Sequence, residues 1–285
     1  MGTVGHNRPR CYRAGDLTPV WVPDAAHEAL RDLVRAREAA KADQLRARHR
    51  LSKFLLHQGR RAAEGVQEWT GKYWDWVKSA VHFEQSAQTV SFIDYVHEVE
   101  HAAARIQRLE QAIDAAVETV PPKMRAVIEA LQALRGVAQV SAVTLVAELG
   151  QISRFERARQ LMGYSGAVSR EHSSGTRIRR GAISKAGNAH LRRVVIEAAW
   201  SYRHRPSLGK ALAARQRRQS EAVKEIAWKA QHRLCHRYRR LMAAGKTKQQ
   251  VVTAIGRELL GFIWAIGVHI ERPPQPRVAR RVLEA

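Results

Sequence analysis

Residues 88–119 read QTVSFIDYVHEVEHAAARIQRLEQAIDAAVET, and this stretch decides the fold of the first half of the chain. Apolar side chains recur every seven residues along it, and a second set lies three residues after each of them: Phe92, Val99, Ile106 and Ile113, then Tyr95, Ala102, Leu109 and Ala116. Four heptads of this kind predict a coiled coil, formed within the chain or between two chains.

Residues 24–57 predict a second long helix. Asp24 follows Pro23 and is a good N-cap, and apolar residues from Leu30 to Leu55 form one stripe. Paired with the heptad helix, it would give an antiparallel hairpin about 45 Å long, at 1.5 Å per residue. We therefore expect residues 24–120 to be a coiled-coil spacer or dimerisation segment, which makes the chain a homo-oligomer.

The remainder of the chain is also predicted to be helical. Pro121-Pro122 ends the hairpin, and residues 121–270 form a second domain with helices over 187–204 and 219–243. A capping box at residues 247–250 opens its last helix, and residues 271–285 predict a basic tail. The only persuasive strand is residues 17–23, so the expected fold class is mainly α.

The charge is concentrated in one segment. The net charge is +23, and residues 151–240 carry 22 Lys and Arg against 5 Asp and Glu. A localised excess of this kind favours a polyanion-binding surface, with nucleic acid preferred over an anionic membrane.

Other classes of protein are disfavoured by what the sequence lacks. Two cysteines give no disulfide framework and favour a reducing cytoplasm. The N-terminus has no signal-peptide pattern, and the longest apolar run, residues 259–268, is too short to span a bilayer. We expect a cytoplasmic protein with no membrane partner.

Two clusters have the spacing of metal ligands, but neither is expected to bind a metal. His232, Cys235 and His236 lack an evident fourth ligand. The second cluster, Asp24, Glu28 and Asp32, is explained by its place at a helix N-terminus. The prediction for this chain is no metal site.

Residues 134–150, LRGVAQVSAVTLVAELG, have the pattern of a helix-hairpin-helix. The turn around Gly136 and Ala138 would expose backbone amides at the start of the second helix, where they can bind a phosphate without reading sequence. Ala138 stands where this motif usually has a second glycine. A plain apolar helical hairpin is the alternative.

Residues 163–188 are rich in Gly, Ser and Arg. Flexible backbone beside hydroxyl and guanidinium groups suits phosphodiester contacts, for which the candidates are Arg170, His172, Arg177, Arg179, Arg180 and Lys185. Ser173 or Ser174 could attack phosphorus if cations stabilise the transition state. A Ser-Ser-Gly turn bonded to its own backbone is the alternative.

A helix beginning at Asn188 presents further candidate nucleic-acid contacts. Its first turns carry Asn188, Arg192 and Arg193, which could face a phosphate backbone. A solvated basic face is the alternative.

Together these pieces resemble the C-terminal domain of the DEDD insertion-sequence transposases, a group that includes the Piv and MooV DNA invertases. The resembling segments are residues 134–150, 154–155 (RF), 171–175 (EHSSG), 180–185 (RGAISK) and 187–192 (GNAHLR). Residues 13–23 (RAGDLTPVWVP) and the Arg-rich helix after them extend the resemblance from about residue 13 to about residue 270.

The resemblance implies DNA transposition or site-specific recombination, and therefore DNA as the partner. In this family an N-terminal RuvC-like, RNase H-fold domain holds Mg²⁺ with four carboxylates, and the C-terminal domain supplies a serine that forms a phosphoserine intermediate. Some members are directed by a structured noncoding RNA, which adds a guide RNA as a further partner. Carried over, the nucleophile falls on Ser173 or Ser174, and Ser174 is favoured. Insertion sequences are bacterial elements, so the expected location is the bacterial cytoplasm.

The departure from the family lies at the N-terminus. All four carboxylates precede the segment equivalent to Arg13, and only twelve residues precede it here. We therefore expect a truncated copy in which residues 1–23 are the remnant of the RuvC-like sheet. We predict that this chain cannot perform transposition alone, and whether it retains any enzymatic activity stays open. The alternatives are a non-catalytic DNA- or RNA-binding module derived from such a transposase, and a general helical RNA-binding protein.

Overall fold

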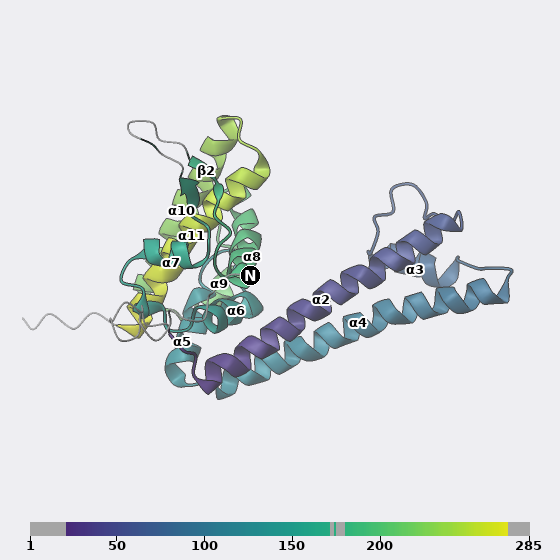
Figure 1. Ribbon diagram of the computed structural model, residues 1–285, viewed down its shortest axis with the longest axis horizontal. Helices are drawn as coiled ribbons and strands as arrows, with labels where there is room; N and C mark the ends of the chain where they lie inside the picture. Colours follow the sequence, from purple (N-terminus) through teal and green to yellow (C-terminus); the bar gives the residue numbers. More distant parts are fainter. Residues whose placement is uncertain (1–20, 172–173, 175–179, 273–285) are drawn as a thin grey trace, which may run out of the picture.

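The heptad stretch forms α4 (Ser86–Thr119), which packs against α2 (Ala25–His57) in a projecting antiparallel hairpin (Figure 1). The repeating positions Phe92, Val99, Ile106 and Ile113 are all buried. Asp24 caps α2, as predicted, because its side chain accepts a hydrogen bond of 2.9 Å from the amide of His27. The pairing of the two helices is thus observed, and coiled-coil supercoiling stays a prediction.

The computed structural model describes residues 21–171, 174 and 180–272. At the far end of the hairpin, α3 (Gly71–Ser79) packs on α2 and α4 through aromatic side chains. Two arginines lie over this cluster, Arg48 at 5.1 Å from the ring centre of Trp69 and Arg60 at 5.5 Å from that of Phe83. The aromatic residues of this segment therefore form a second, smaller core.

A helical domain follows the hairpin. Its helices are α5 (Pro122–Leu131), α6 (Gln139–Leu149), η1 (Ile152–Arg154), α7 (Ala158–Tyr164), α8 (Ala189–Ala199), η2 (Trp200–Arg203), α9 (Lys210–Gln216), α10 (Glu221–Ala243) and α11 (Lys248–Glu271). Strands β1 (Ser169–Glu171) and β2 (Arg180–Ile183) pair antiparallel, Ser169 with Ile183 and Glu171 with Arg180. The described part of the chain is mainly helical, which confirms the predicted fold class.

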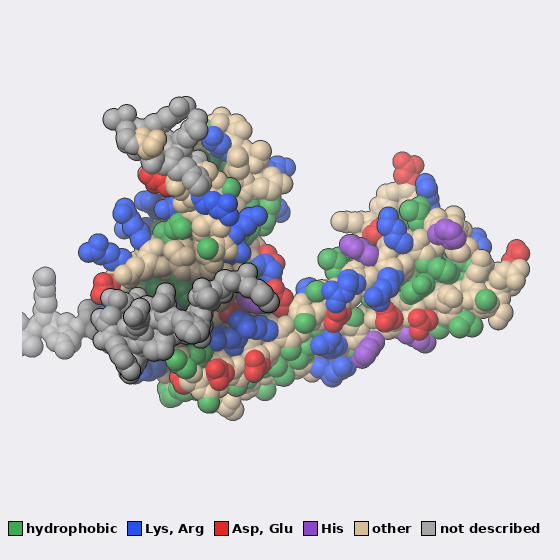
Figure 2. All heavy atoms as spheres, in the orientation of Figure 1, with side chains coloured by type: hydrophobic (Ala, Val, Ile, Leu, Met, Phe, Trp, Pro, Cys, Tyr) green, Lys and Arg blue, Asp and Glu red, His purple; other side chains and the backbone are tan. Residues whose placement is uncertain are grey.

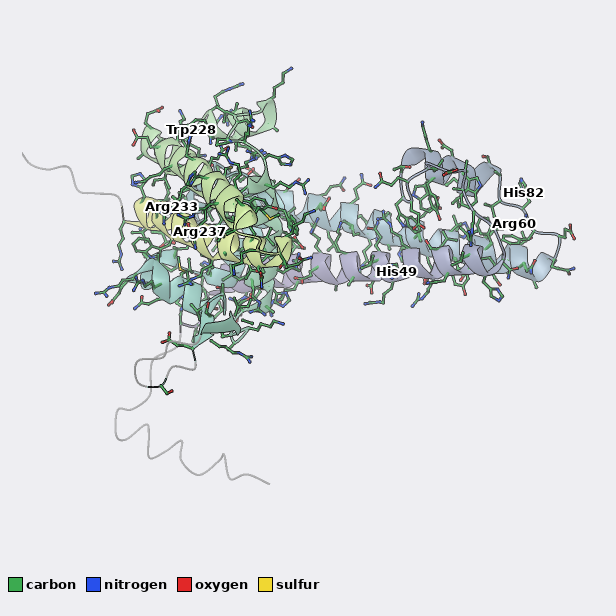
Figure 3. All side chains as sticks on the ribbon, turned by 90° about the horizontal axis from the view of Figure 1, so that it is seen from above. His49, Arg60, His82, Trp228, Arg233 and Arg237 are labelled. Carbon is green, nitrogen blue, oxygen red and sulfur yellow. The ribbon has the colours of Figure 1, made fainter. Side chains whose placement is uncertain are left out.

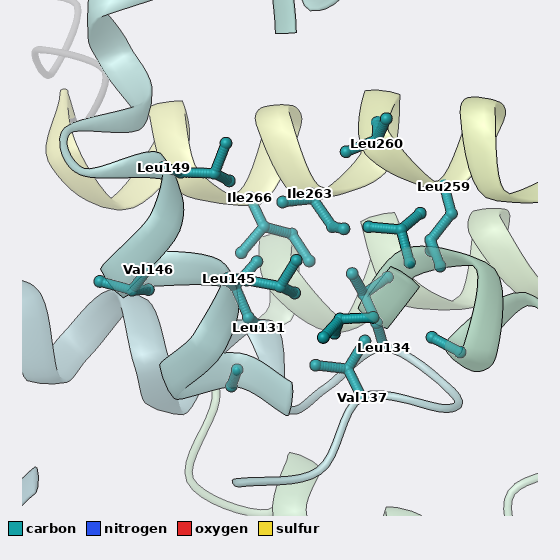
Figure 4. Close-up of a cluster of buried hydrophobic side chains, with 14 of the residues drawn as sticks. Leu131, Leu134, Val137, Leu145, Val146, Leu149, Leu259, Leu260, Ile263 and Ile266 are labelled. Atoms are coloured by element: carbon teal, nitrogen blue, oxygen red, sulfur yellow. The ribbon is translucent and has the colours of Figure 1, made fainter. Parts of the chain in front are cut away.

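Helix α11 is the centre of this domain's core (Figure 4). It packs against α5, α7, α8 and α10, and its side chains Leu259, Leu260 and Ile263 are fully buried. In the described residues it is the one helix that is long and apolar enough to cross a membrane, but half of that apolar stretch is buried inside the protein. Its apolar character is therefore accounted for by its position in the core.

The base of the hairpin shares this core. Leu30 and Val34 of α2, and Ile113 and Val117 of α4, pack in the same cluster as the helices of the domain. Residues on both sides of Pro121-Pro122 thus contribute to one core.

Two local features differ from the sequence-based predictions. In the predicted strand over residues 17–23, Trp21, Val22 and Pro23 are irregular, and Leu17–Val20 lie outside the described residues. Pro23 has no amide to donate, and Asp24 is already committed to capping α2. Conversely, β1 and β2 arise in the Gly-, Ser- and Arg-rich stretch, which carries no alternating apolar pattern.

Gly136 illustrates how closely the α5–α6 turn packs on the rest of the domain. Its φ is +81°, and a Cβ there would collide with the carbonyl oxygen of Ala198 and the hydroxyl of Ser201. Only glycine fits this position, because both the backbone conformation and the space exclude a side chain.

We predict that Gly136→Ala lowers the free energy of unfolding by about 3 kcal/mol or more, from left-handed backbone strain and overpacking together. The matched control is Gly245→Ala, since Gly245 has φ +71° with nothing near its would-be Cβ. It should lose only about 1 kcal/mol. Urea unfolding at pH 7 measures both, and equal losses would contradict the packing argument.

Candidate nucleic-acid interface

Ser174 lies between β1 and β2, and it is exposed. All three residues of β1 are exposed as well, so this hairpin stands clear of the core (Figure 1). Ser173, His172, Arg177 and Arg179 lie outside the described residues, and Arg180 is the first residue of β2. Of the two candidate nucleophiles, the structure therefore describes Ser174.

The root of this hairpin is held by hydrogen bonds from Arg192. Its guanidinium donates to the carbonyl oxygens of Ser165 (2.9 Å) and Lys185 (3.3 Å). Lys185 has a left-handed φ of +56°, a conformation that costs a non-glycine residue about 1–2 kcal/mol. The Lys185 side chain is exposed, whereas Arg192 is half-buried and engaged within the protein.

Arg170 also belongs to the hairpin. Its side chain is exposed and donates a hydrogen bond of 3.2 Å to the carbonyl oxygen of Ser184. One guanidinium nitrogen thus bonds to the residue that follows β2, and the side chain is otherwise exposed. Arg170 is placed to contact an anion at the hairpin.

Glu148 of α6 connects the start of α8 to α2, the first helix of the α2–α4 hairpin. Its carboxylate is completely buried and accepts a bidentate pair of hydrogen bonds from Arg35, at 2.8 and 3.0 Å. It also accepts a hydrogen bond of 2.6 Å from the side-chain amide of Asn188, whose own oxygen caps α8 at the amide of Leu191. The Asn188 side chain therefore has intramolecular partners on both sides.

Glu38 makes a second connection between the same elements. Its two oxygens contact His190 Nδ1 (2.6 Å) and Arg193 Nε (2.8 Å), both on α8. Arg193 also reaches Glu197 at 2.9 Å. The positive charge of Arg193 is thus balanced by two carboxylates, which leaves it less available to a phosphate than its place in the sequence indicates.

Both carboxyl groups are held in the ionised form. Burial raises the pKa of Glu148, but hydrogen bonds from Arg35 and Asn188 outweigh it, so the net pKa lies below the ordinary value. In Glu38, burial likewise raises the pKa, and Arg193 and His190 lower it further than burial raises it. The two groups therefore bind α2 to α8 as charged partners at neutral pH.

The start of α6 faces a groove of about 850 Å³ between α2, α4 and α8. Ala138 occupies the N-cap position without a side-chain cap, so the first amides of α6 are not satisfied by a capping side chain. Arg37, Lys41 and Arg193 line the same groove, together with the carboxylates of Glu38 and Glu110. Asp114 and Glu197 line it as well, so four carboxylates match the cations of this groove, and phosphate binding by a helix-hairpin-helix stays a prediction.

A second groove of about 850 Å³ lies at the base of the β1–β2 hairpin, beside α7, α10 and α11. Four arginines line it, and Glu258 pairs with two of them, Arg233 and Arg237, at 3.1 and 2.8 Å. Arg159 and Arg257 have no carboxylate partner in the described part of the chain. Figure 2 shows Lys and Arg side chains gathered on the helical domain below the β1–β2 hairpin.

The sequence-based candidates did not include these groove residues. Arg159 and Arg233 belong to the basic segment 151–240 and Arg257 lies beyond it, and the three come from elements that only the fold brings together. The signal that was available is the repeated basic spacing along residues 229–240.

No group of three His, Cys, Asp or Glu side chains in the described residues is close enough to hold a metal ion. Cys235 is buried while His232 and His236 are exposed, and Asp24 is occupied in capping α2. The Mg²⁺ implied by the family resemblance therefore has no matching set of ligands in residues 21–171, 174 and 180–272.

Comparisons with known proteins find similarity over the domain that carries the β1–β2 hairpin. Residues 128–214 match the model of the transposase IS116/IS110/IS902 family. The chain is 44% identical over 258 residues to putative transposase y4qE of Sinorhizobium fredii, covering 90% of this chain and 62% of that protein. It is 28% identical over 225 residues to the transposase for insertion sequence element IS1533 of Leptospira borgpetersenii, covering 79% and 64%. The chain thus spans less than two thirds of the length of these two relatives.

We predict that Glu148→Gln lowers the free energy of unfolding by about 1–3 kcal/mol, because it weakens charge-assisted hydrogen bonds at a buried position while the Arg35 guanidinium keeps contact with water. The control is Glu225→Gln on α10, an exposed glutamate without a hydrogen bond or ion pair in the described structure. It should change stability by less than about 0.5 kcal/mol. Urea unfolding at pH 7 compares the two, and similar effects would contradict the role assigned to Glu148.

A pH dependence follows from the lowered pKa values of Glu148 and Glu38. A carboxyl group whose folded pKa is depressed stabilises the protein above its unfolded pKa, about 4.3 for Glu, and this contribution is lost as the pH falls through the folded value. We expect the wild type to lose stability steeply below about pH 4.3, and Glu148→Gln to show a shallower loss. Thermal unfolding at several pH values from 7 to 3 measures the slopes, and parallel curves would contradict this assignment.

Proposed function

From the transposase domain matched by residues 128–214, we propose that this chain is part of an insertion-sequence transposase that binds DNA and cleaves it with Ser174. The relatives named as transposases support the class of reaction. The assignment of the serine rests on the family resemblance of residues 171–175, and the exposed position of Ser174 between β1 and β2 is compatible with it. No part of the core blocks access to its hydroxyl at this position.

The chemistry is a transesterification. The Ser174 oxygen attacks phosphorus and forms a new O–P bond, while the bond from phosphorus to one deoxyribose oxygen breaks. The serine loses its proton, and the departing deoxyribose oxygen gains one. Because the phosphodiester energy is kept in the phosphoserine linkage, the step can be reversed onto another DNA end, as strand exchange requires.

The surroundings of the hairpin suit this reaction. Negative charge builds up on the phosphoryl oxygens in the transition state, and guanidinium groups stabilise it through charge-assisted hydrogen bonds. Arg170 and Lys185 are exposed at the hairpin, and Arg159 and Arg257 line the groove at its base. We assign these four cations to the DNA backbone.

Two further partners belong to this proposal. The guide RNA and self-association through the hairpin of α2 and α4 stay predictions. Exposed apolar side chains on that hairpin, Leu45, Leu56, Val90 and Ile93, support the second of them, because water-exposed apolar surface favours burial against another molecule.

The serine is tested by trapping the covalent intermediate. Labelled duplex DNA that spans both flanks of the gene is incubated with the chain and Mg²⁺, and protein–DNA adducts are separated under denaturing conditions. We expect an adduct with the wild type and none with Ser174→Ala. Ser169→Ala is the matched control, since Ser169 is an exposed serine of the same hairpin.

Three results would contradict parts of this assignment. An adduct that survives Ser174→Ala but not Ser173→Ala would move the nucleophile by one residue. Retained DNA binding without any wild-type adduct would leave the chain as a binding module. DNA binding that does not weaken as the salt concentration rises would contradict the assignment of the basic residues to DNA phosphates.

A further inference from the structure

Trp228 on α10 is the one exposed tryptophan of the seven in the chain. Its side chain is 47% exposed, whereas the other six are buried or half-buried in cores and helix junctions. Figure 3 shows it on α10, with Arg233 and Arg237 farther along the same helix. An exposed indole offers a large flat apolar face on which another planar group can stack.

The ring of Trp228 is held in place by its neighbour one turn later. The His232 ring lies 4.5 Å from it between centroids, at an interplanar angle of 70°. Such an edge-to-face contact fixes the orientation of the indole and leaves part of its surface open. The indole is therefore a preorganised flat surface rather than a loose side chain.

Both signs of charge lie around this flat surface: the exposed Glu225 precedes Trp228 by about one turn, and exposed cations follow it along α10. Lys229, Arg240 and His236 are exposed, and neither Lys229 nor Arg240 forms an ion pair with a carboxylate in the described structure. The spacing from Trp228 to Arg240 corresponds to about 18 Å of helix. Glu258 neutralises Arg233 and Arg237, which lie at the other border of this face.

An aromatic surface among free cations matches the chemistry of a single-stranded polynucleotide. An unpaired base stacks on the ring, and the cations along α10 contact phosphates farther along the same strand. The bases of an intact duplex hide their faces from such a ring. An acidic peptide would satisfy the cations but offers no planar partner for the indole.

We propose that the exposed face of α10, formed by Trp228, Lys229, His232, His236 and Arg240, binds an unpaired stretch of nucleic acid by stacking one base on Trp228. This proposal rests on the proposed function, because it specifies a nucleic-acid partner for the same basic domain. The surface begins after residue 214, beyond the segment matched by the transposase model.

The experiment compares single-stranded and duplex binding by the whole chain. Fluorescein-labelled dT20, U20 and a 40-base-pair duplex are titrated with wild type and Trp228→Leu by fluorescence anisotropy at fixed salt. Loss of one stacked base should raise the dissociation constant for the single strands about fivefold to 150-fold, and leave the duplex within about twofold. Trp228→Phe should restore most of the affinity, because it keeps an aromatic face.

Two further variants separate stacking from general effects. Leu208→Ala is the matched control, since Leu208 is an exposed apolar side chain at 52% outside α10, and single-strand affinity should be unchanged. Lys229→Ala with Arg240→Ala should flatten the salt dependence of single-strand binding by about 0.7 in logarithmic slope for each charge. Far-ultraviolet circular dichroism checks that each variant is folded.

The outcomes discriminate between the two proposals. If the wild type binds polynucleotides and Trp228→Leu binds dT20 and U20 equally well, the stacking site is overturned while nucleic-acid binding stands. If the wild type binds none of the three probes, the proposed function fails with it. A larger effect on U20 than on dT20 identifies RNA as the preferred strand, and the reverse identifies DNA.

Discussion

The buried carboxylate of Glu148 is the contact on which the arrangement of this molecule depends. A single charge, removed from water, joins Arg35 of α2 to Asn188 at the start of α8. An ionised group can occupy such a position only when its partners compensate for lost hydration. The long hairpin, the core helix α6 and the segment that ends the β1–β2 hairpin are therefore fixed relative to one another by the same group.

Local patterns in the sequence predicted the helical architecture well. The heptads of residues 88–119 predicted that Phe92, Val99, Ile106 and Ile113 would be buried, and the capping box at residues 247–250 is present with both of its hydrogen bonds. These features depend on residues a few positions apart in the chain, so the sequence alone is enough to predict them. The paired strands β1 and β2 were missed, because a short exposed hairpin buries no apolar face and so needs no alternation.

The candidate site was harder to predict for a related reason. Arg193 looked free for a phosphate because its partner Glu38 is 155 residues away, and Asn188 looked free because Glu148 comes from another helix. Sequence patterns do not encode such distant contacts, so cations that hold the fold together cannot be told from cations that face a ligand. The α10 surface could not be predicted for a different reason. Its basic residues are visible in the sequence, but the exposure of Trp228 depends on how the helix packs.

The anchoring of α2 also has a mechanical consequence. α2 is one continuous helix of 33 residues, about 50 Å long, with its first turns in the core of the domain and its last turns in the aromatic cluster at the far end. A stiff rod held at one end acts as a lever. A tilt of about 5° at Glu38 would carry the far end, about 28 Å away, through about 2.5 Å. A molecule bound at that end would therefore be displaced when the contacts next to the β1–β2 hairpin rearrange slightly.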